Sequence, residues 1–300
     1  MAFKQVTIIG TGLIGGSLGL ALKKRHLAGR IIGCDRAPVL ERAHECGAIE
    51  SGSTHPADAM RGSDLVVLAT PVIPILDLIG RLGPALPAKT LVTDVGSTKA
   101  EIVEAAAKSF GRNAGQRFLG GHPMAGKENA GVEFADADLF EGAAWLFTPL
   151  LGQNVYAGQC GEFIHCAEKM GAKIAVVDPA DHDRLCAWNS HLPQIISTAL
   201  AATLVDEFGP DAPVLDIGGR ALREMTRISG SPYSMWRDIA ITNKGNIAAV
   251  LQKLEQRLAH IRENLDSREL AAEFELAHQL RKSLLRKHGD AEKSNSSKKK

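Results

Sequence analysis

Residues 4–24 read KQVTIIGTGLIGGSLGLALKK, and this stretch decides the fold. Residues 4–9 form a short apolar run rich in β-branched side chains, which predicts a buried strand. Residues 10–15 then supply the pattern G-x-G-x-x-G, and residues 16–24 carry apolar side chains at helical spacing. Strand, glycine turn and helix in this order form the context in which the pattern binds a dinucleotide.

Each glycine of the turn has a physical reason to be glycine. Gly10 permits the tight turn, Gly12 lets the backbone approach a pyrophosphate, and Gly15 lets the helix pack closely on the strand. The first N–H groups of the helix have no partner inside it and are available to phosphates. The predicted cofactor-binding residues of the turn are Gly10, Thr11, Gly12, Leu13, Ile14 and Gly15.

Asp35 ends the next predicted strand, residues 30–34, and lies 25 residues after Gly10. A carboxylate at about this spacing accepts hydrogen bonds from the adenosine ribose and repels a 2′-phosphate, so NAD is favoured over NADP. Arg36 weakens this preference, because arginine can stack on adenine or pair with a 2′-phosphate. A glycine-rich turn that binds no nucleotide is the alternative interpretation.

Strands and helices continue to alternate as far as residue 178, which predicts a Rossmann-type α/β domain with a parallel sheet. Ligands of such sheets bind beyond the carboxyl ends of the strands. The glycine turn, Thr70, Ser97 and His122 each follow a predicted strand, so we expect them to line one crevice. The further strands are predicted at 64–69, 90–95, 117–119, 144–147 and 173–177, and the helices at 36–46, 72–82, 100–110 and 154–170.

His122 stands in the segment 120–128, GGHPMAGKE, which is predicted to be a glycine-rich loop. Histidine exchanges protons near pH 7, so His122 is a candidate base, although a lone loop histidine is more often structural. Ser97 has two interpretations. It is either an N-cap of the following helix, with Glu101 nearby, or a hydroxyl that contacts the nicotinamide, the substrate or His122. Lys99 is predicted to be a solvated helix residue.

No strand pattern returns after residue 178, so an all-α domain is predicted for residues 179–288. Pro193 removes a backbone donor inside the first long helix, and a kink is expected near Asn189. Residues 289–300 are polar and lysine-rich, which predicts a disordered tail. The helices are predicted at 181–205, 212–228, 234–241, 244–264 and 268–287, and leucines at helical spacing in the last two are typical of a core or a subunit interface.

Polar side chains among the apolar residues of this half need an explanation. His191 and Gln194 lie within an apolar helix, and Trp236 follows the segment that contains Arg227. For Arg227 two interpretations are equally good. The side chain is either a snorkelling or ion-paired surface group, or it binds a substrate carboxylate with two hydrogen bonds.

Composition narrows the classes of partner. The formal net charge is +1 at pH 7, which gives no reason to expect a nucleic acid or an anionic membrane as partner. No apolar run approaches the roughly 18 residues of a membrane span, and the N-terminus shows no signal-peptide pattern, so a cytoplasmic protein is expected. The five cysteines include no C-x-x-C, which predicts reduced thiols and no metal site.

Several motifs follow one another within residues 4–285, namely GTGLIGGSLG, DVGSTK, GGHPMAGKE, DHDR, SHLPQ, TRIS and MWRDI. Taken together and in this order, they resemble those of the prephenate/arogenate (cyclohexadienyl) dehydrogenase family, TyrA-type enzymes. The resemblance implies a Rossmann-type domain, a helical dimerisation domain, NAD as cofactor and a homodimer. It implies oxidative decarboxylation of prephenate or L-arogenate to 4-hydroxyphenylpyruvate or L-tyrosine, in tyrosine biosynthesis.

The resemblance also implies roles for individual residues. His122 corresponds to the histidine that accepts the proton of the substrate 4-hydroxyl group. Ser97 corresponds to the serine that holds this histidine, the hydroxyl and the nicotinamide together, and Arg227 to the arginine that binds a substrate carboxylate. The other residues implied at the substrate site are His191, Gln194, Glu128 and Trp236.

Two positions depart from the family pattern. Gln194 replaces the histidine of many relatives, so the resemblance does not fix substrate choice or inhibition by tyrosine, and Glu224 replaces an aspartate. A dehydrogenase of the β-hydroxyacid type is one alternative, but the lysine motif that such enzymes carry in their second domain is missing from this sequence. An NAD-sensing module without catalytic activity is another, and the joint presence of His122, Ser97 and Arg227 argues against it.

Overall fold

The structure is a computed structural model that describes residues 2–83, 86–87, 89–127, 129–211 and 213–297. It divides into two compact units, Met1–Ile247 and Ala248–Lys300. This division lies later in the chain than residue 178, where alternating strands and helices give way to helices alone. The first unit therefore contains the whole sheet together with the first helices that follow it.

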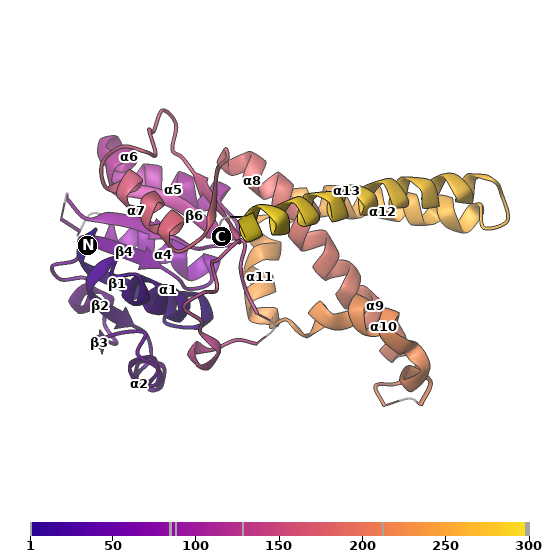
Figure 1. Cartoon of the computed structure of the whole chain (residues 1–300), viewed down its shortest axis with the longest axis horizontal. Coiled ribbons are helices and arrows are strands. Elements are labelled where there is room, and N and C mark those ends of the chain that lie inside the picture. The colour runs from indigo at the N-terminus through magenta and orange to yellow at the C-terminus, as the bar shows by residue number, and fades with distance from the viewer. Residues whose placement is uncertain (1, 84–85, 88, 128, 212, 298–300) are drawn as a thin grey trace. The chain divides into compact units, whose positions relative to one another are not determined.

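One mixed sheet forms the centre of the first unit (Figure 1). Its strands are β1 (Phe3–Ile9), β2 (Ala28–Cys34), β3 (Ser51–Ser53), β4 (Leu65–Leu68), β5 (Leu91–Asp94), β6 (Phe118–Pro123), β7 (Ala144–Thr148) and β8 (Lys173–Val176). The spatial order is β3-β2-β1-β4-β5-β6-β7-β8, and all neighbours are parallel except β6 and β7. The first six strands have the order of dinucleotide-binding folds, with the switch point between β1 and β4. The predicted Rossmann-type fold is confirmed.

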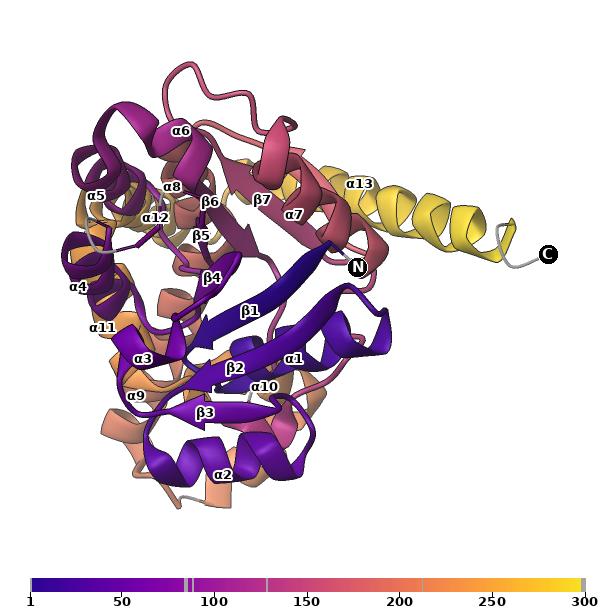
Figure 2. The same ribbon diagram turned by 90° about the vertical axis from the view of Figure 1, so that its left-hand side faces the viewer.

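Helices cover both faces of this sheet (Figure 2). Leu65 and Val67 pack into one apolar core, while Val66 and Leu68 pack into the other, because successive strand residues point to opposite faces. Both faces are therefore buried, which explains why the strands read as continuous apolar runs. The helices are α1 (Leu13–Lys24), α2 (Ala37–Glu45), α3 (Pro56–Ala59), α4 (Val72–Leu82), α5 (Ala100–Phe110), α6 (Ala114–Arg117) and α7 (Gly158–Lys169). The sequence reading missed the short elements β3, α3 and α6.

Residues 120–123 of the segment predicted to be a loop belong to a strand, whereas residues 124–127 lie outside any helix or strand. Strand β6 continues through Gly120 and Gly121 to Pro123 and pairs antiparallel with β7. A Cβ on Gly120 would lie 2.3 Å from Thr148 Oγ1, and one on Gly121 would lie 2.8 Å from the Asp94 carbonyl oxygen. These glycines permit close packing around the strand, and their presence had suggested a loop. His122 is consequently held by a sheet.

Helices follow residue 178. They are α8 (Pro179–Cys186), α9 (Leu192–Phe208), α10 (Gly219–Thr226) and α11 (Tyr233–Thr242). A π-helical turn, Ala187–His191, separates α8 from α9 at the place where Pro193 predicted an interruption. The helix predicted at 212–228 is wrong in part, because the 3₁₀ turns Pro213–Gly218 and Arg227–Gly230 flank the shorter α10. Residue 212 lies outside the described residues.

Two buried carboxylates join these later helices to the sheet domain. Asp183 of α8 accepts hydrogen bonds from the N–H groups of Lys99 and Ala100, at the start of α5. Asp238 of α11 accepts one from the N–H group of Ile73, in the first turn of α4. Carboxylates at helix N-termini satisfy free N–H groups and interact favourably with the helix dipole. These contacts fix α8 and α11 against the sheet domain.

The second unit consists of most of α12 (Lys244–Glu263) and of α13 (Glu269–Ser297), which lie side by side (Figure 1). Arg257 and His260 of α12 face Glu273 of α13 in a small ionic cluster. The helix continues to Ser297, so the tail predicted to be disordered from residue 289 is helical in the part described; alanine, glutamate and lysine in this stretch favour its extension. Within the described residues, no helix combines the length and apolarity needed to cross a membrane.

Candidate active site

Two pockets meet at the switch point of the sheet. The first, of about 510 Å³, lies beyond β1 and β2 and is lined by Gly10, Asp35, Arg36 and Thr70 among others. Gly10 has a φ of 93°, and a Cβ there would lie 2.5 Å from the Ala69 carbonyl oxygen, so only glycine fits this turn. Four residues predicted to bind the cofactor are thus brought together.

Asp35 is already fixed in place by the glycine turn. Its Oδ2 accepts hydrogen bonds from the Thr11 N–H at 2.8 Å and from the Thr11 hydroxyl at 3.3 Å. Its Oδ1 accepts one from the Arg36 N–H at 2.8 Å. Thr11 is buried, so its role is to hold the carboxylate. The first pocket therefore presents an oriented acceptor at the position where adenosine ribose binds in this fold.

The second pocket, of about 350 Å³, lies at the N-terminus of α1. Gly12, Leu13 and Ile14 line it together with Thr70, which also lines the first pocket. A Cβ on Gly12 would meet nothing within 4 Å, whereas one on Gly15 would lie 1.9 Å from the Gly10 carbonyl oxygen. Gly12 thus leaves space for a ligand, and Gly15 allows helix and turn to pack, as the sequence predicted. Free N–H groups at this helix end suit a pyrophosphate.

Ser97 lines the second pocket beside Gly96, just beyond β5. Its interpretation as an N-cap is wrong, because Asp183 receives the N–H groups that begin α5. The opposite wall contains Ser231 and Met235, from the helical part. The pocket is therefore closed by residues from both predicted domains.

A buried ion pair holds the strand residue that precedes His122. Asp94 accepts hydrogen bonds from Gly96 N–H at 2.8 Å and from Gly121 N–H at 3.2 Å. Lys99 Nζ bonds to Asp94 Oδ2 and, at 2.9 Å, to the Gly121 carbonyl oxygen. One carboxylate thus links the wall of the second pocket to the backbone beside His122. Lys99 is fully buried, so its prediction as a solvated residue is wrong.

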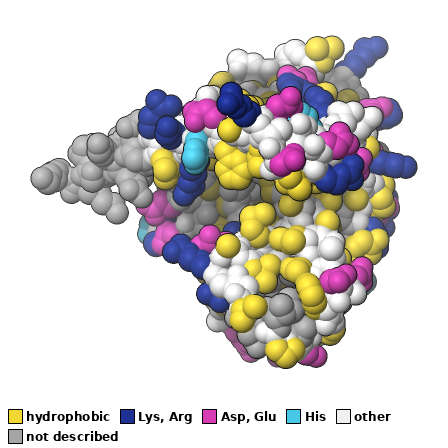
Figure 3. Space-filling model, turned by 90° about the vertical axis from the view of Figure 1, so that its right-hand side faces the viewer, with side chains coloured by type: hydrophobic (Ala, Val, Ile, Leu, Met, Phe, Trp, Pro, Cys, Tyr) yellow, Lys and Arg dark blue, Asp and Glu magenta, His cyan; other side chains and the backbone are white. Residues whose placement is uncertain are grey.

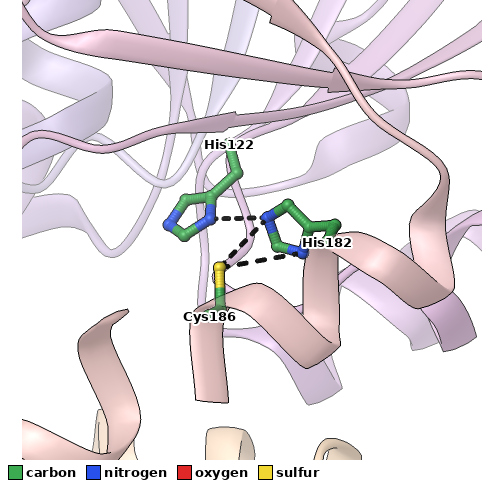
Figure 4. A group of neighbouring side chains, drawn as sticks. All are labelled: His122, His182 and Cys186. Carbon is green, nitrogen blue, oxygen red and sulfur yellow. Dashed lines mark hydrogen bonds between the residues drawn. The ribbon is translucent and has the colours of Figure 1, made fainter. Parts of the chain in front are cut away.

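His122 contacts a second histidine, His182 of α8 (Figure 4). The two nitrogens, His122 Nδ1 and His182 Nε2, are 2.9 Å apart. His182 Nδ1 donates a hydrogen bond of 2.8 Å to Asp183 Oδ1. Cys186, one helical turn later, has its Sγ 3.6 Å from His182 Nε2. His182 is thus a hydrogen-bond partner of His122, and the contact between His122 and Ser97 stays a prediction.

Burial disfavours the charged forms of His122 and His191. Burial lowers the pKa of His122 well below its usual 6.5, and His182 and the charge of Lys99 lower it further. Burial likewise lowers the pKa of His191 to about 4, although the charge of Asp183 acts in the opposite direction. At neutral pH the ring of His122 is therefore unprotonated on one nitrogen, which a general base requires.

His122, His182 and Cys186 form a group whose ligand atoms lie within 4.8 Å of one another, a spacing that suits a metal ion. Burial, followed by the charge of Asp183, raises the pKa of the Cys186 thiol to about 12 in the metal-free protein. The facing nitrogens of the two histidines are also occupied by each other. We interpret this group as a hydrogen-bonded network.

The remaining predicted substrate residues lie in the helical part of the first unit. His191 is buried, where Asn243 Nδ2 lies 3.1 Å from its Nδ1 and Trp236 packs against its ring edge-on. Gln194 donates to the Ile228 carbonyl oxygen at 2.8 Å and accepts from the Ser231 hydroxyl at 3.2 Å, so it braces the turn that contains Arg227.

Arg227 itself is exposed at the start of that turn, four residues before the pocket residue Ser231. Glu224, the residue that departs from the family pattern, pairs with Arg220 on α10. Glu128 lies outside the described residues.

Sequence reasoning missed the residues that support His122. His182 and Asp183 stood within the motif DHDR, but nothing in their spacing linked them to a histidine 60 residues earlier. Asp94 and Lys99 stood within DVGSTK. The available signal was an acidic residue at a strand end, followed five residues later by a lysine of opposite charge.

Family models, relatives and solved structures agree on one family. The nucleotide-binding domain of prephenate dehydrogenase matches residues 18–176, and its dimerization domain matches residues 178–282. Prephenate dehydrogenase of Lactococcus lactis is 33% identical over 265 residues, covering 87% of this chain and 70% of that protein. Cyclohexadienyl dehydrogenase of Zymomonas mobilis is 27% identical over 269 residues, covering 89% and 90%.

Two solved structures share both the fold and the extent of the chain. Prephenate dehydrogenase from A. aeolicus, in complex with hydroxyphenyl propionate and NAD+, has a TM-score of 0.81 at 30% identity and covers 95% of this chain and 97% of that one. Arogenate dehydrogenase of Synechocystis has a TM-score of 0.69 at 28% identity, covering 96% and 99%. Together with the nucleotide crevice, these matches establish that the chain belongs to the prephenate dehydrogenase family.

Proposed function

We propose that this protein catalyses the NAD-dependent oxidative decarboxylation of a cyclohexadienyl acid, prephenate or L-arogenate, and so forms 4-hydroxyphenylpyruvate or L-tyrosine in tyrosine biosynthesis. One observation carries the proposal. A histidine whose pKa is lowered well below its usual value follows Gly121, and the Asp94 carboxylate accepts hydrogen bonds both from the N–H of Gly121 and from that of Gly96 in the wall of the second pocket. A dinucleotide crevice and a neutral base are the two parts that this reaction needs.

His122 supplies the proton chemistry in this proposal. Its free nitrogen accepts the proton of the 4-hydroxyl group as C4–O becomes a carbonyl. NAD held by the glycine turn and Asp35 would supply the acceptor for the hydride that leaves C4. Loss of the ring carboxylate as carbon dioxide then makes the ring aromatic, and the protonated His122 returns its proton to the phenolate oxygen. Ser97 and Thr70 line the pocket where the reacting ring and nicotinamide meet.

Absorbance of the reduced nicotinamide tests the proposal. Purified protein with NAD is mixed with prephenate or with L-arogenate, each with and without added tyrosine. Turnover of either acid supports the proposal, and the ratio of the two kcat/KM values identifies the preferred substrate. No turnover of either acid, with NAD still bound, refutes the activity.

His122→Asn tests the base. The variant is expected to lose about 100-fold or more in kcat, because a positioned general base contributes at least that much. Binding of NAD, measured by calorimetry, is expected to be unchanged. His165→Asn is the matched control, since His165 is an exposed residue of α7. Full activity of His122→Asn would exclude His122 as the base.

NAD is the proposed cofactor in preference to NADP, and Asp35 is the proposed reason. Its carboxylate is oriented by Thr11 and lines the first pocket, where it would repel a 2′-phosphate. Asp35→Ala is expected to reduce the ratio of kcat/KM for NAD to that for NADP. An unchanged ratio would place the discrimination in other residues, among which Arg36 is the first to test.

Arg227 is proposed to bind a substrate carboxylate through its guanidinium group. Gln194 braces its turn, and His191 and Trp236 pack together nearby in the same helical part. Arg227→Ala is expected to raise KM for the cyclohexadienyl acid more than it lowers kcat. Arg223→Ala, which removes an exposed arginine of the neighbouring α10, is the control. An unaltered KM would show that the carboxylate binds elsewhere.

A homodimer is proposed as the assembled form. The family's dimerization domain matches residues 178–282, and hydrophobic side chains are frequent on the face of the molecule in Figure 3. In the helical part of the first unit the exposed large apolar residues include Trp188, Val205, Phe208, Met225, Tyr233 and Ile241. Exposed apolar surface of this kind is typical of a subunit interface. Sedimentation equilibrium that gives a monomer at micromolar concentration would refute this proposal.

A further inference from the structure

We propose that His182 and Asp183 are positioning residues which determine that Nδ1 of His122 carries the ring proton and Nε2 is the basic nitrogen. The inference rests on the proposed function, in which His122 is the base. A neutral imidazole has one N–H donor and one acceptor, and the hydrogen bond made by one nitrogen sets the state of the other. The tautomer of His122 is therefore decided by its neighbour.

The side-chain oxygens of Asp183 meet three groups. The N–H of Lys99 donates to Oδ1 at 2.6 Å, and the N–H of Ala100 donates to Oδ2 at 2.9 Å. His182 Nδ1 lies 2.8 Å from Oδ1. Because two backbone N–H groups already donate to the side chain of Asp183, this side chain acts as an acceptor. In the third contact, His182 Nδ1 must therefore be the donor. His182 thus carries its proton on Nδ1.

The second step follows from the chemistry of a neutral ring. With Nδ1 of His182 protonated, its Nε2 is an acceptor. This nitrogen lies 2.9 Å from Nδ1 of His122, which must then donate. The proton of His122 is consequently on Nδ1, and Nε2 retains the lone pair that accepts a substrate proton. A free imidazole side chain has no such constraint.

The surroundings keep this arrangement rigid. His182 and Asp183 are buried side chains on adjacent positions of α8, and Asn243 Nδ2 donates to the backbone carbonyl of Asp183 at 2.8 Å. The backbone of the residue before His122 is held by Asp94 and Lys99. Both ends of the His122–His182 contact are therefore anchored. After proton transfer, the same hydrogen bond from Nδ1 to His182 keeps the His122 ring in place, as the buried aspartate does for the histidine of serine-protease triads.

Titratable and charged groups of four different elements lie around His122. His182 lies on α8, Lys99 at the start of α5, Asp94 at the end of β5, and His191 in the π-helical turn. Lys99 and the two histidines disfavour a positive charge on His122. The hydrogen bond with His182 therefore fixes the orientation of the His122 ring, although the other charged groups oppose protonation of this ring.

Nitrogen NMR of the free enzyme tests the tautomer directly. Protein labelled with ¹⁵N at histidine gives distinct shifts for protonated and unprotonated ring nitrogens. The chain has ten histidines, so the signals of His122 are assigned by their loss in His122→Asn. The expected result is a protonated Nδ1 and an unprotonated Nε2 at pH 7. A proton on Nε2 overturns the inference, whether or not any cyclohexadienyl acid is turned over.

Two variants of His182 separate positioning from simple packing. His182→Gln keeps an acceptor for His122 and a donor for Asp183, whereas His182→Leu keeps neither. His182→Leu is expected to lose about 100-fold in kcat, and His182→Gln is expected to stay within about tenfold of the wild type. KM and NAD affinity are expected to change by less than about threefold in both. His165→Leu is the exposed control.

The outcomes are distinguishable. Equal losses of kcat in His182→Gln and His182→Leu would show a packing role only and would overturn the inference, as would full activity of His182→Leu. If His182→Leu does not fold, the NMR result on the wild-type protein still decides which nitrogen of His122 carries the proton. If the wild type does not oxidise prephenate or L-arogenate but Nδ1 of His122 is protonated, the proposed function fails while the assignment of the tautomer stands.

Discussion

Replacement of Lys99 by methionine is the most informative test of how the site is built. Lys99 and Asp94 are both fully buried, and the ammonium group bonds to Asp94 and to the carbonyl oxygen of Gly121. Methionine fills much of the same volume but carries no charge. Lys99→Met therefore leaves the Asp94 carboxylate in the interior with two backbone N–H donors, those of Gly96 and Gly121.

The expected cost of Lys99→Met is large. Removing one partner of a buried ion pair costs about 3–5 kcal/mol, because the remaining charge is left uncompensated. This is a substantial share of the roughly 5–15 kcal/mol that stabilises a typical domain. Burial lowers the pKa of Lys99 and the charge of Asp94 opposes this, so the two groups are stable only as a pair. Activity is expected to fall as well, since the strand that carries His122 loses an anchor.

Urea unfolding at fixed protein concentration measures how much Lys99→Met lowers the free energy of unfolding. The control is Lys108→Met on α5, which removes an exposed lysine paired with Glu104 and should cause no measurable loss. The double variant Lys99→Met/Asp94→Asn should regain at least about 2 kcal/mol, because it removes the uncompensated charge, although the single amide oxygen of asparagine replaces two oxygens that each accept a backbone N–H. If Lys99→Met loses less than about 1 kcal/mol, the reasoning about a buried pair is refuted.

Three further predictions concern pH, the helical wall and metals. The folded-state pKa of His191, about 4 against a usual 6.5, means that the unfolded chain binds an extra proton between these pH values, so acid destabilises the protein. In urea titrations, the free energy of unfolding should therefore fall by about 3 kcal/mol less between pH 7 and pH 4 in His191→Asn than in the wild type. An equal fall in both proteins would contradict the lowered pKa of His191. Gln194→Leu should raise KM more than it lowers kcat, because the turn at Arg227 loses its brace; steady-state kinetics with an unaltered KM would contradict this. Dialysis against EDTA should leave turnover unchanged, and a loss restored by Zn²⁺ would show that His182 and Cys186 hold a metal.

The family of the chain and the architecture of its nucleotide-binding domain were predictable from sequence because their signals are local. Residues 4–24 contain a β-branched run, then three glycines, then an amphipathic helix. The geometry of Gly10 and Gly15 supports the roles that were assigned to these two glycines. Strand ends also mark the carboxyl edge of a parallel sheet. The position of Thr70 and Ser97 in one crevice therefore followed from topology alone.

The support of the candidate base was decided by tertiary structure. His122 and His182 are 60 residues apart, and Asp183 bonds to a backbone group 84 residues away, distances over which no periodic pattern in the sequence extends. Gly120 and Gly121 misled the sequence reading, since a glycine needed for close strand packing looks the same as a glycine in a loop. Lys99 misled it for a similar reason: a lysine is predicted to be solvated unless its partner is known, and that partner is brought to it only by the folded sheet.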